Sequence, residues 1–258
     1  MPPEPAPVFL VGEDVAHEAL AVQLFDGRLM QRVQWLDAPE HVREWKRPSW
    51  APTAQNDRPR VDAKSDPPRR IHGRLQGQPY KEGARKLRQW VVSFAQETDE
   101  PSILIVMTDT DGKDRRAGID QIKSWLTDQN DLPHLVVGCA HRDAEAWFMP
   151  LARLESGHAD RLALAKQALS FDPASQPERL STGKSDPKRV VRFVLMEEGE
   201  SLPENEPGCA TPPAHAARNF AERLRTHLDN LGDYQACGLT PFLHDIDDAL
   251  IAVGLVHP

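Results

Sequence analysis

Two aspartates separated by one residue, Asp109 and Asp111, are the side chains of this sequence best suited to chemistry. They follow Ile103–Met107, an apolar run rich in Ile and Val that predicts a strand buried on both faces. Side chains two residues apart in an extended segment point to the same side, so both carboxylates could hold one hard cation. The pair therefore predicts a cation site at the carboxyl end of a strand, where open α/β sheets place their ligands.

Further acidic residues follow two other predicted strands. Glu13 comes after the apolar run Val8–Val11, and Glu145 comes shortly after His134–Ala140, with Asp143 as an alternative at that place. Because parallel strands end at one edge of a sheet, these carboxylates are expected to converge. Convergent carboxylates repel one another unless a cation neutralises them, and oxygen ligands suit Mg²⁺ or Mn²⁺. The predicted metal ligands are Glu13, Asp109, Asp111 and Glu145.

Basic residues in two segments are candidates for contact with phosphate. Lys184 and Lys188, in TGKSDPKR, could place a cation beside a scissile phosphate, and Lys184 is the predicted catalytic lysine. Arg69, Arg70 and Arg74 could follow a nucleic-acid backbone, although a solvated loop is the commoner reason for such residues.

The elements that must position these residues alternate between strand and helix. The pattern predicts an α/β fold with a doubly wound, mainly parallel sheet in residues 1–150, interrupted by a Pro-rich insertion at 39–80. Residues 151–258 are predicted to form a helical, loop-rich extension packed on that sheet, with one weak strand at 190–195. Strands are expected at 8–11, 29–36, 102–108 and 134–140, and helices at 16–25, 81–97, 116–130, 151–169, 214–231 and 240–253.

Composition narrows the class of protein. The net charge of -8 argues against a uniformly basic nucleic-acid coat, but residues 39–80 carry nine Lys or Arg against five Asp or Glu. The three cysteines lie far apart, which disfavours a zinc knuckle or a disulfide framework and favours the reduced cytoplasm. No apolar stretch approaches the roughly 20 residues that span a bilayer, so no membrane segment is expected.

The order of strand, Glu13, helix and then SILIVMTDTDG resembles the Toprim domain, whose signature is a glutamate after the first strand and a DxD after a later one. HLVVGCAHRDAEAWFM is similar to a segment of small Toprim relatives near the nucleases of the overcoming-lysogenization-defect type. The resemblance covers about residues 8–150. It implies a Mg²⁺- or Mn²⁺-dependent nuclease with Glu13, Asp109 and Asp111 in catalytic roles.

The same resemblance also implies partners. Such relatives often act on DNA or RNA beside an ATPase in prokaryotic anti-phage defence, and an oligomer is compatible with that role. This sequence contains no GxxxxGK[ST] phosphate loop, so a partner protein would have to supply any ATPase activity.

Two departures keep other functions open. A glycine precedes Glu13 instead of following it, and His17 stands where the family commonly has an acid, with Glu18 beside it as a substitute. These departures motivate a second hypothesis, a non-catalytic interaction or sensor subunit. A third hypothesis is a phosphatase of the haloacid-dehalogenase type with Asp109 as nucleophile, although Lys113 stands where that family has Thr or Val. Its late acidic motif would come from Asp245, Asp247 and Asp248.

Overall fold

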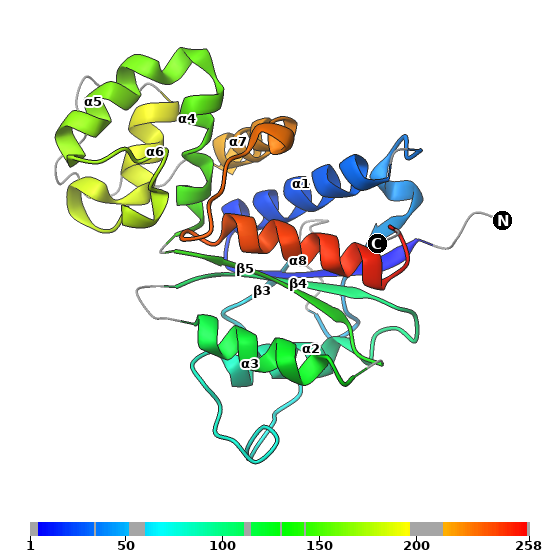
Figure 1. Cartoon of the computed structure of the whole chain (residues 1–258). Coiled ribbons are helices and arrows are strands. Elements are labelled where there is room, and N and C mark those ends of the chain that lie inside the picture. The colour runs from blue at the N-terminus through cyan, green and yellow to red at the C-terminus, as the bar shows by residue number, and fades with distance from the viewer. Residues whose placement is uncertain are drawn as a thin grey trace.

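The computed structural model describes residues 5–33, 35–51, 60–110, 115–129, 131–141, 143–196 and 214–256 (Figure 1). Asp111, one of the predicted metal ligands, lies outside these described residues. Lys113, which bears on the phosphatase hypothesis, lies outside them as well.

The centre of the protein is a parallel β-sheet. In the described residues it has five strands in the order β2-β1-β4-β5, and β3 also pairs with β1. Strand β2 pairs with the first half of β1 and β3 with its second half, so the two short strands share one edge. The strands are β1 (Ala6–Gly12), β2 (Arg43–Trp45), β3 (Arg60–Asp62), β4 (Ile103–Asp109) and β5 (His134–Ala140). This arrangement confirms the predicted α/β class with a mainly parallel sheet.

Helices cover both faces of the sheet (Figure 1). Helices α2 (Ala84–Phe94) and α3 (Arg116–Leu126) pack on one face, and α1 (Val15–Arg32) and α8 (Leu239–Ala252) on the other. Helix α7 (Ala214–Thr226) lies against the outer side of α1. A smaller helical group follows the carboxyl end of β5 and comprises η2 (Ala144–Phe148), α4 (Leu151–Leu154), η3 (Ser156–His158), α5 (Ala159–Leu169) and α6 (Pro187–Leu195). The other 3-10 turns of the described residues are η1 (Pro39–His41), η4 (Pro177–Arg179) and η5 (Gly183–Ser185) between α5 and α6, and η6 (Leu228–Asn230).

Side chains of the central strands alternate between two apolar cores. Leu10, Ile105 and Met107 point toward α1 and α8, whereas Val11 and Val106 point toward α2 and α3. This alternation follows from the pleat of each strand, which sends successive side chains to opposite faces. It also decides on which side of the sheet each residue at the strand ends lies.

The strand predicted at 29–36 is wrong, because α1 continues to Arg32. Leu29 lies four residues after Phe25 on the buried side of the helix, and both are fully buried. Gly27 resembles a helix break in the sequence, but it permits close packing. A Cβ at this position would lie 2.6 Å from Cδ1 of Leu228, in the turn after α7.

The strand predicted at 190–195 is also wrong, since these residues belong to α6. The helix begins after Asp186, whose side chain accepts a hydrogen bond from the Arg189 backbone N–H at 3.2 Å. Pro187 occupies the first helical position, where its missing N–H costs nothing. The β-branched residues that suggested a strand instead pack at helical spacing against the core.

The predicted insertion at 39–80 supplies β2 and β3 as well as loops. Each of these strands has three residues, too few to give a recognisable period. Helix α8 belongs to the predicted extension, yet it packs directly on β5 and shares one apolar core with α1. None of the helices in the described ranges is long and apolar enough to cross a bilayer.

Candidate functional site

The carboxyl ends of β1 and β4 bring Asp14 and Asp109 to the same side of the sheet. Asp109 is the last residue of β4, and Asp14 lies just beyond β1 as the N-cap of α1. One carboxylate oxygen of Asp14 accepts hydrogen bonds from the backbone N–H groups of Ala16 (2.9 Å) and His17 (3.1 Å). Such a cap satisfies N–H groups that the first helical turn leaves without partners. It also fixes the first turn of α1, and therefore His17, above the sheet edge.

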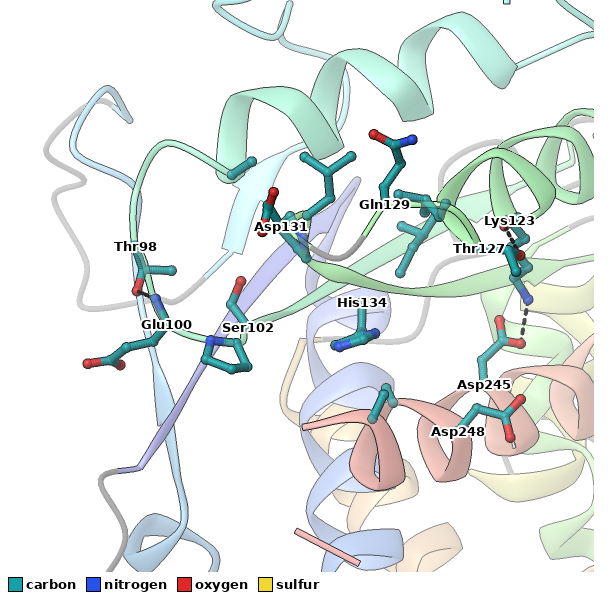
Figure 2. Close-up of a pocket in the computed structure, with 18 of the residues that line it drawn as sticks. Thr98, Glu100, Ser102, Lys123, Thr127, Gln129, Asp131, His134, Asp245 and Asp248 are labelled. Carbon is teal, nitrogen blue, oxygen red and sulfur yellow. Dashed lines mark hydrogen bonds and ion pairs between the residues drawn. The ribbon is translucent and has the colours of Figure 1, made fainter. Parts of the chain in front are cut away.

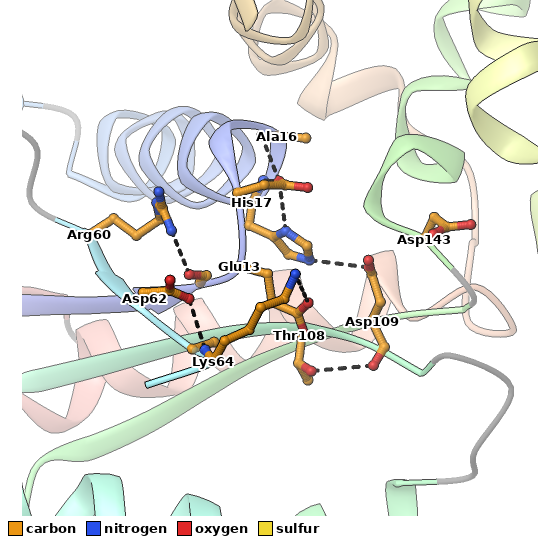
Figure 3. Close-up of polar contacts among 12 residues, drawn as sticks. Glu13, Ala16, His17, Arg60, Asp62, Lys64, Thr108, Asp109 and Asp143 are labelled. Carbon is orange, nitrogen blue, oxygen red and sulfur yellow. Dashed lines mark hydrogen bonds and ion pairs between the residues drawn. The ribbon is translucent and has the colours of Figure 1, made fainter. Parts of the chain in front are cut away.

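His17 bridges these two carboxylates (Figure 3). Its Nδ1 lies 2.9 Å from Oδ1 of Asp14, and its Nε2 lies 3.1 Å from Oδ1 of Asp109. The residue is fully buried. Burial disfavours the charged ring, but the hydrogen bonds to Asp109 and Asp14 outweigh it and raise the pKa of His17 to about 10. The imidazolium form then donates from both nitrogens and sets one positive charge against two carboxylates.

Asp14 shows the reciprocal effect. Burial alone would raise the pKa of its carboxyl, yet the hydrogen bond and the charge of His17 hold that pKa well below its usual range. Asp14 is therefore ionised at neutral pH. Through its contacts with Asp14 and Asp109, His17 supplies a positive charge from within the protein at the carboxyl ends of β1 and β4.

Glu145 and Lys188 come to the same edge from the helical group after β5. Glu145 lies in η2 and is 2% exposed, and Lys188 Nζ in α6 lies 3.9 Å from its Oε1. The same ammonium lies 3.8 Å from Oδ1 of Asp143. Burial raises the pKa of Glu145 to about 7, against the lowering effect of Lys188, and the charges of Asp14 and Asp109 add to the rise. Because Asp14 and Asp109 affect its pKa, Glu145 interacts electrostatically with both residues.

Lys188 responds in the opposite direction. Burial disfavours its charge, but the charges of Glu145, Asp143, Asp109 and Asp14 raise its pKa above the usual lysine value. Lys188 therefore keeps its charge within the acidic cluster. Of the two predicted lysines, Lys184 instead lies exposed in the turn Gly183–Ser185.

Glu13, a predicted catalytic ligand, lies on the other side of the sheet from Asp109. It lines a cavity of about 670 Å³ next to α2, together with Thr108. Its carboxylate lies 3.7 Å from Nζ of Lys64 (Figure 3). Val11 pairs with Val106 in register. The same register, continued by two residues along both strands, places Glu13 beside Thr108. One residue further, on the opposite face, Asp14 lies near Asp109. Asp14, one residue later, thus occupies the place that the sequence pattern predicted for Glu13.

Glu18, the predicted substitute acid, is engaged in another contact. Nε of Arg60 lies 3.4 Å from its Oε2, and Nη1 of Arg60 donates to the Gly12 carbonyl at 2.8 Å. These contacts connect β3 to the end of β1 and the start of α1. Glu18 therefore supports the local structure beside the acidic cluster.

The described residues of the cluster offer oxygen donors but no closed metal cage. Within the described ranges, no three His, Cys, Asp or Glu side chains are grouped to hold one ion. Mg²⁺ commonly retains several waters and uses only one or two carboxylates plus a substrate phosphate. Asp109 and Glu145 provide such oxygen donors, whereas a structural zinc site would require four protein ligands.

The acids of the phosphatase hypothesis do not join Asp109. Asp245 pairs with Lys123, accepts from the Val137 N–H at 3.1 Å, and lines a cavity of about 1040 Å³ with Asp248 (Figure 2). Ser102 and His134, at the starts of β4 and β5, also line this cavity, so it lies at the opposite edge of the sheet. The remaining acid, Asp247, is paired with Arg28 and Arg32 of α1.

Comparison with protein-family models, curated proteins and solved structures gave no match to this chain. The resemblance to the Toprim domain therefore stays a prediction drawn from the residues themselves.

Proposed function

We propose that this protein is a nuclease that hydrolyses phosphodiester bonds with the help of Mg²⁺ or Mn²⁺. The observation that carries the proposal is the position of Asp109, at the end of β4, and of the pair Glu145 and Lys188, in the helical group after β5, at the carboxyl edge of a parallel sheet. Two buried carboxylates beside a half-buried ammonium suit a reaction in which a cation and a phosphate share one site. The substrate class comes from the resemblance stated above.

Each residue has a distinct part in this proposal. Asp109 and Glu145 would hold the ion, which when bound would activate water and neutralise charge on the phosphate. Lys188 would contact a phosphate oxygen and stabilise the charge that develops there. His17 would act as a positioning residue, because its hydrogen bond fixes one oxygen of Asp109 and leaves the other available.

The test is a cleavage assay on single-stranded DNA, double-stranded DNA and RNA, with Mg²⁺, Mn²⁺ or EDTA. Asp109→Asn and Glu145→Gln are expected to lower the cleavage rate at least about a hundredfold, the usual scale for losing one electrostatic contact in a reacting site. Asp160→Asn is the matched control, because Asp160 is an exposed acid on α5. Asp111→Asn belongs in the same series as a test of the sequence prediction.

Circular dichroism of each variant separates loss of activity from loss of fold. Metal-dependent cleavage that Asp109→Asn and Glu145→Gln leave unchanged would contradict the proposed site. A folded wild type that cleaves none of the three substrates with either metal would contradict the nuclease proposal itself. The predicted ATPase partner is examined by repeating the assay with ATP and the candidate partner protein.

One observation favours a second candidate function, the non-catalytic interaction or sensor subunit. His17 already offsets part of the negative charge of Asp14 and Asp109, which reduces the demand of this edge for a metal ion. This candidate predicts nucleic-acid or protein binding without cleavage. The cytoplasmic location and the role in anti-phage defence stay predictions under either candidate.

A further inference from the structure

A strongly basic segment adjoins the acidic edge. Residues 60–88 contain nine Lys or Arg and three Asp or Glu, whereas the rest of the chain contains twenty-two basic and thirty-six acidic residues. The segment runs from β3 through a loop into α2, on the face of the sheet opposite α1. An acidic protein thus concentrates positive charge on one face, where the local potential can attract an anion despite the net charge.

Four basic residues of this segment line the cavity of about 670 Å³ that Glu13 also lines. The cationic residues of its wall come from the loop after β3, from α2 and its approach, and from the start of α3. They are Lys64, Lys81, Arg85, Lys86 and Arg115. Thr108 closes the wall on the sheet side near the carboxyl end of β4, so the cavity lies at the same end of the sheet as Asp109 but on the opposite face.

Two of these cations lack an acidic partner within the described residues. Lys81 and Arg85 are exposed, and neither side chain pairs there with a carboxylate. Arg85 instead lies over the ring of Tyr80, 5.3 Å from its centroid, and the Tyr80 hydroxyl accepts from Arg88 at 2.6 Å. The wall therefore combines two exposed cations, Lys81 and Arg85, with an aromatic ring that neighbouring arginines contact.

We propose that this cavity, formed by α2 and the loop before it, binds the phosphodiester backbone of single-stranded nucleic acid. Sites that bind single strands commonly combine lysine and arginine contacts to phosphates with an aromatic side chain beside them. The cavity has the volume of pockets that enclose small ligands, which admits part of one strand but not a duplex. The strand would lead toward Asp109, and this last step rests on the proposed nuclease function.

The experiment measures binding separately from cleavage. Fluorescence anisotropy of labelled single-stranded DNA and RNA oligonucleotides, and of a DNA duplex of the same length, is recorded in EDTA across a series of salt concentrations. Lys81→Gln/Arg85→Gln is expected to weaken single-strand binding at low salt at least about tenfold and to reduce the log–log salt slope by about 1.4. Lys166→Gln/Arg218→Gln removes two exposed cations elsewhere and is the charge-matched control.

The outcomes distinguish this inference from the proposed function. Equal binding by the cavity variant and the control variant would overturn the inference, and so would a duplex that binds as tightly as a single strand. If single strands bind through the cavity but are not cleaved with Mg²⁺ or Mn²⁺, the binding inference holds and the nuclease proposal fails. The DNA and RNA arms identify which strand the cavity prefers.

Discussion

At the scale of single residues, His17 determines the charge balance of the candidate site. Its ring bridges Asp14 and Asp109 from a fully buried position, so one imidazolium serves two carboxylates. Loss of one member of such a buried charge pair leaves the others without compensation. A divalent cation is the natural replacement, which links the state of His17 to the affinity of this edge for metal.

We expect His17→Gln to lower the free energy of unfolding by about 3 kcal/mol in EDTA. About 10 mM Mg²⁺ should restore roughly 1 kcal/mol of this loss, because an ion that binds only the folded state stabilises it. Urea unfolding with and without MgCl₂, against NaCl of equal ionic strength, measures both effects. The matched control is His72→Gln at an exposed loop position. An identical response to Mg²⁺ in the wild type and His17→Gln would contradict this explanation.

Sequence reasoning located the acidic edge but not all of its members. Asp109 and Glu145 drew attention because each follows an apolar run that was predicted, correctly, as a buried strand. The choice between Glu13 and Asp14 depends on the register between β1 and β4, which no residue pattern within β1 reveals. The pairing of His17 with two acids depends on how far α1 turns before it meets the sheet, and this too requires the folded chain.

At the scale of elements, the start of α8 must approach β5 closely. Gly238 is the N-cap of α8 and has a φ of 91°, and a Cβ there would lie 2.3 Å from the Cys139 carbonyl oxygen. Nearby, the Trp147 indole N–H donates to the Cys237 carbonyl at 2.8 Å and connects this turn to η2, which carries Glu145. The turn before α8 is therefore connected by a hydrogen bond to the element that carries Glu145.

We predict that Gly238→Ala lowers the free energy of unfolding by roughly 3 kcal/mol, because left-handed backbone strain adds to a collision with backbone. Gly254→Ala is the control, since Gly254 has a φ of 75° but no atom within 4 Å of the place that a Cβ would take. Strain alone should cost that variant about 1 kcal/mol. Chemical denaturation of both proteins gives the difference, and equal losses would show that the approach to Cys139 does not matter.

The elements that sequence reasoning found are those with a strong period. Strands β4 and β5 and helices α2, α3 and α8 were predicted within a few residues of their ends. The errors arose where a short apolar pattern fits a helix and a strand equally well, as at 29–36 and 190–195. They also arose where a strand has only three residues. The informative residues there are Gly27, which lets α1 pack closely against the turn after α7, and Pro187, which occupies the first position of α6. The apolar pattern shows neither role.

At the scale of the whole molecule, the C-terminal helices complete the main core. Leu239, Phe242, Ile246 and Leu250 of α8 are fully buried in the core that also contains α1 and β5. At roughly 2 kcal/mol for each buried side chain, burial of these four residues favours the folded state by about 8 kcal/mol before the entropy cost of ordering α8.

A chain that ends after residue 196 should therefore fail to unfold cooperatively. It lacks α7 and α8 and would expose the apolar face of β5 and the outer side of α1. Thermal unfolding followed by near-ultraviolet circular dichroism, together with binding of an apolar dye, measures this loss, and a chain that ends after residue 256 is the control. A sharp transition in the shorter chain would contradict this prediction, because it would show that α7 and α8 are not needed for cooperative folding of the rest.

The outer strands of the sheet, β2 and β3 on one side and β5 on the other, affect how the protein behaves at high concentration. On one side, β2 and β3 divide the edge of β1 into two short pieces, and on the other side Asp245 accepts the outward Val137 N–H of β5. Short edge strands and an occupied edge N–H both hinder the strand-to-strand pairing that begins aggregation. The same features that shape the loops around the candidate site thus protect a long, apolar parallel sheet from joining with its copies during synthesis and storage.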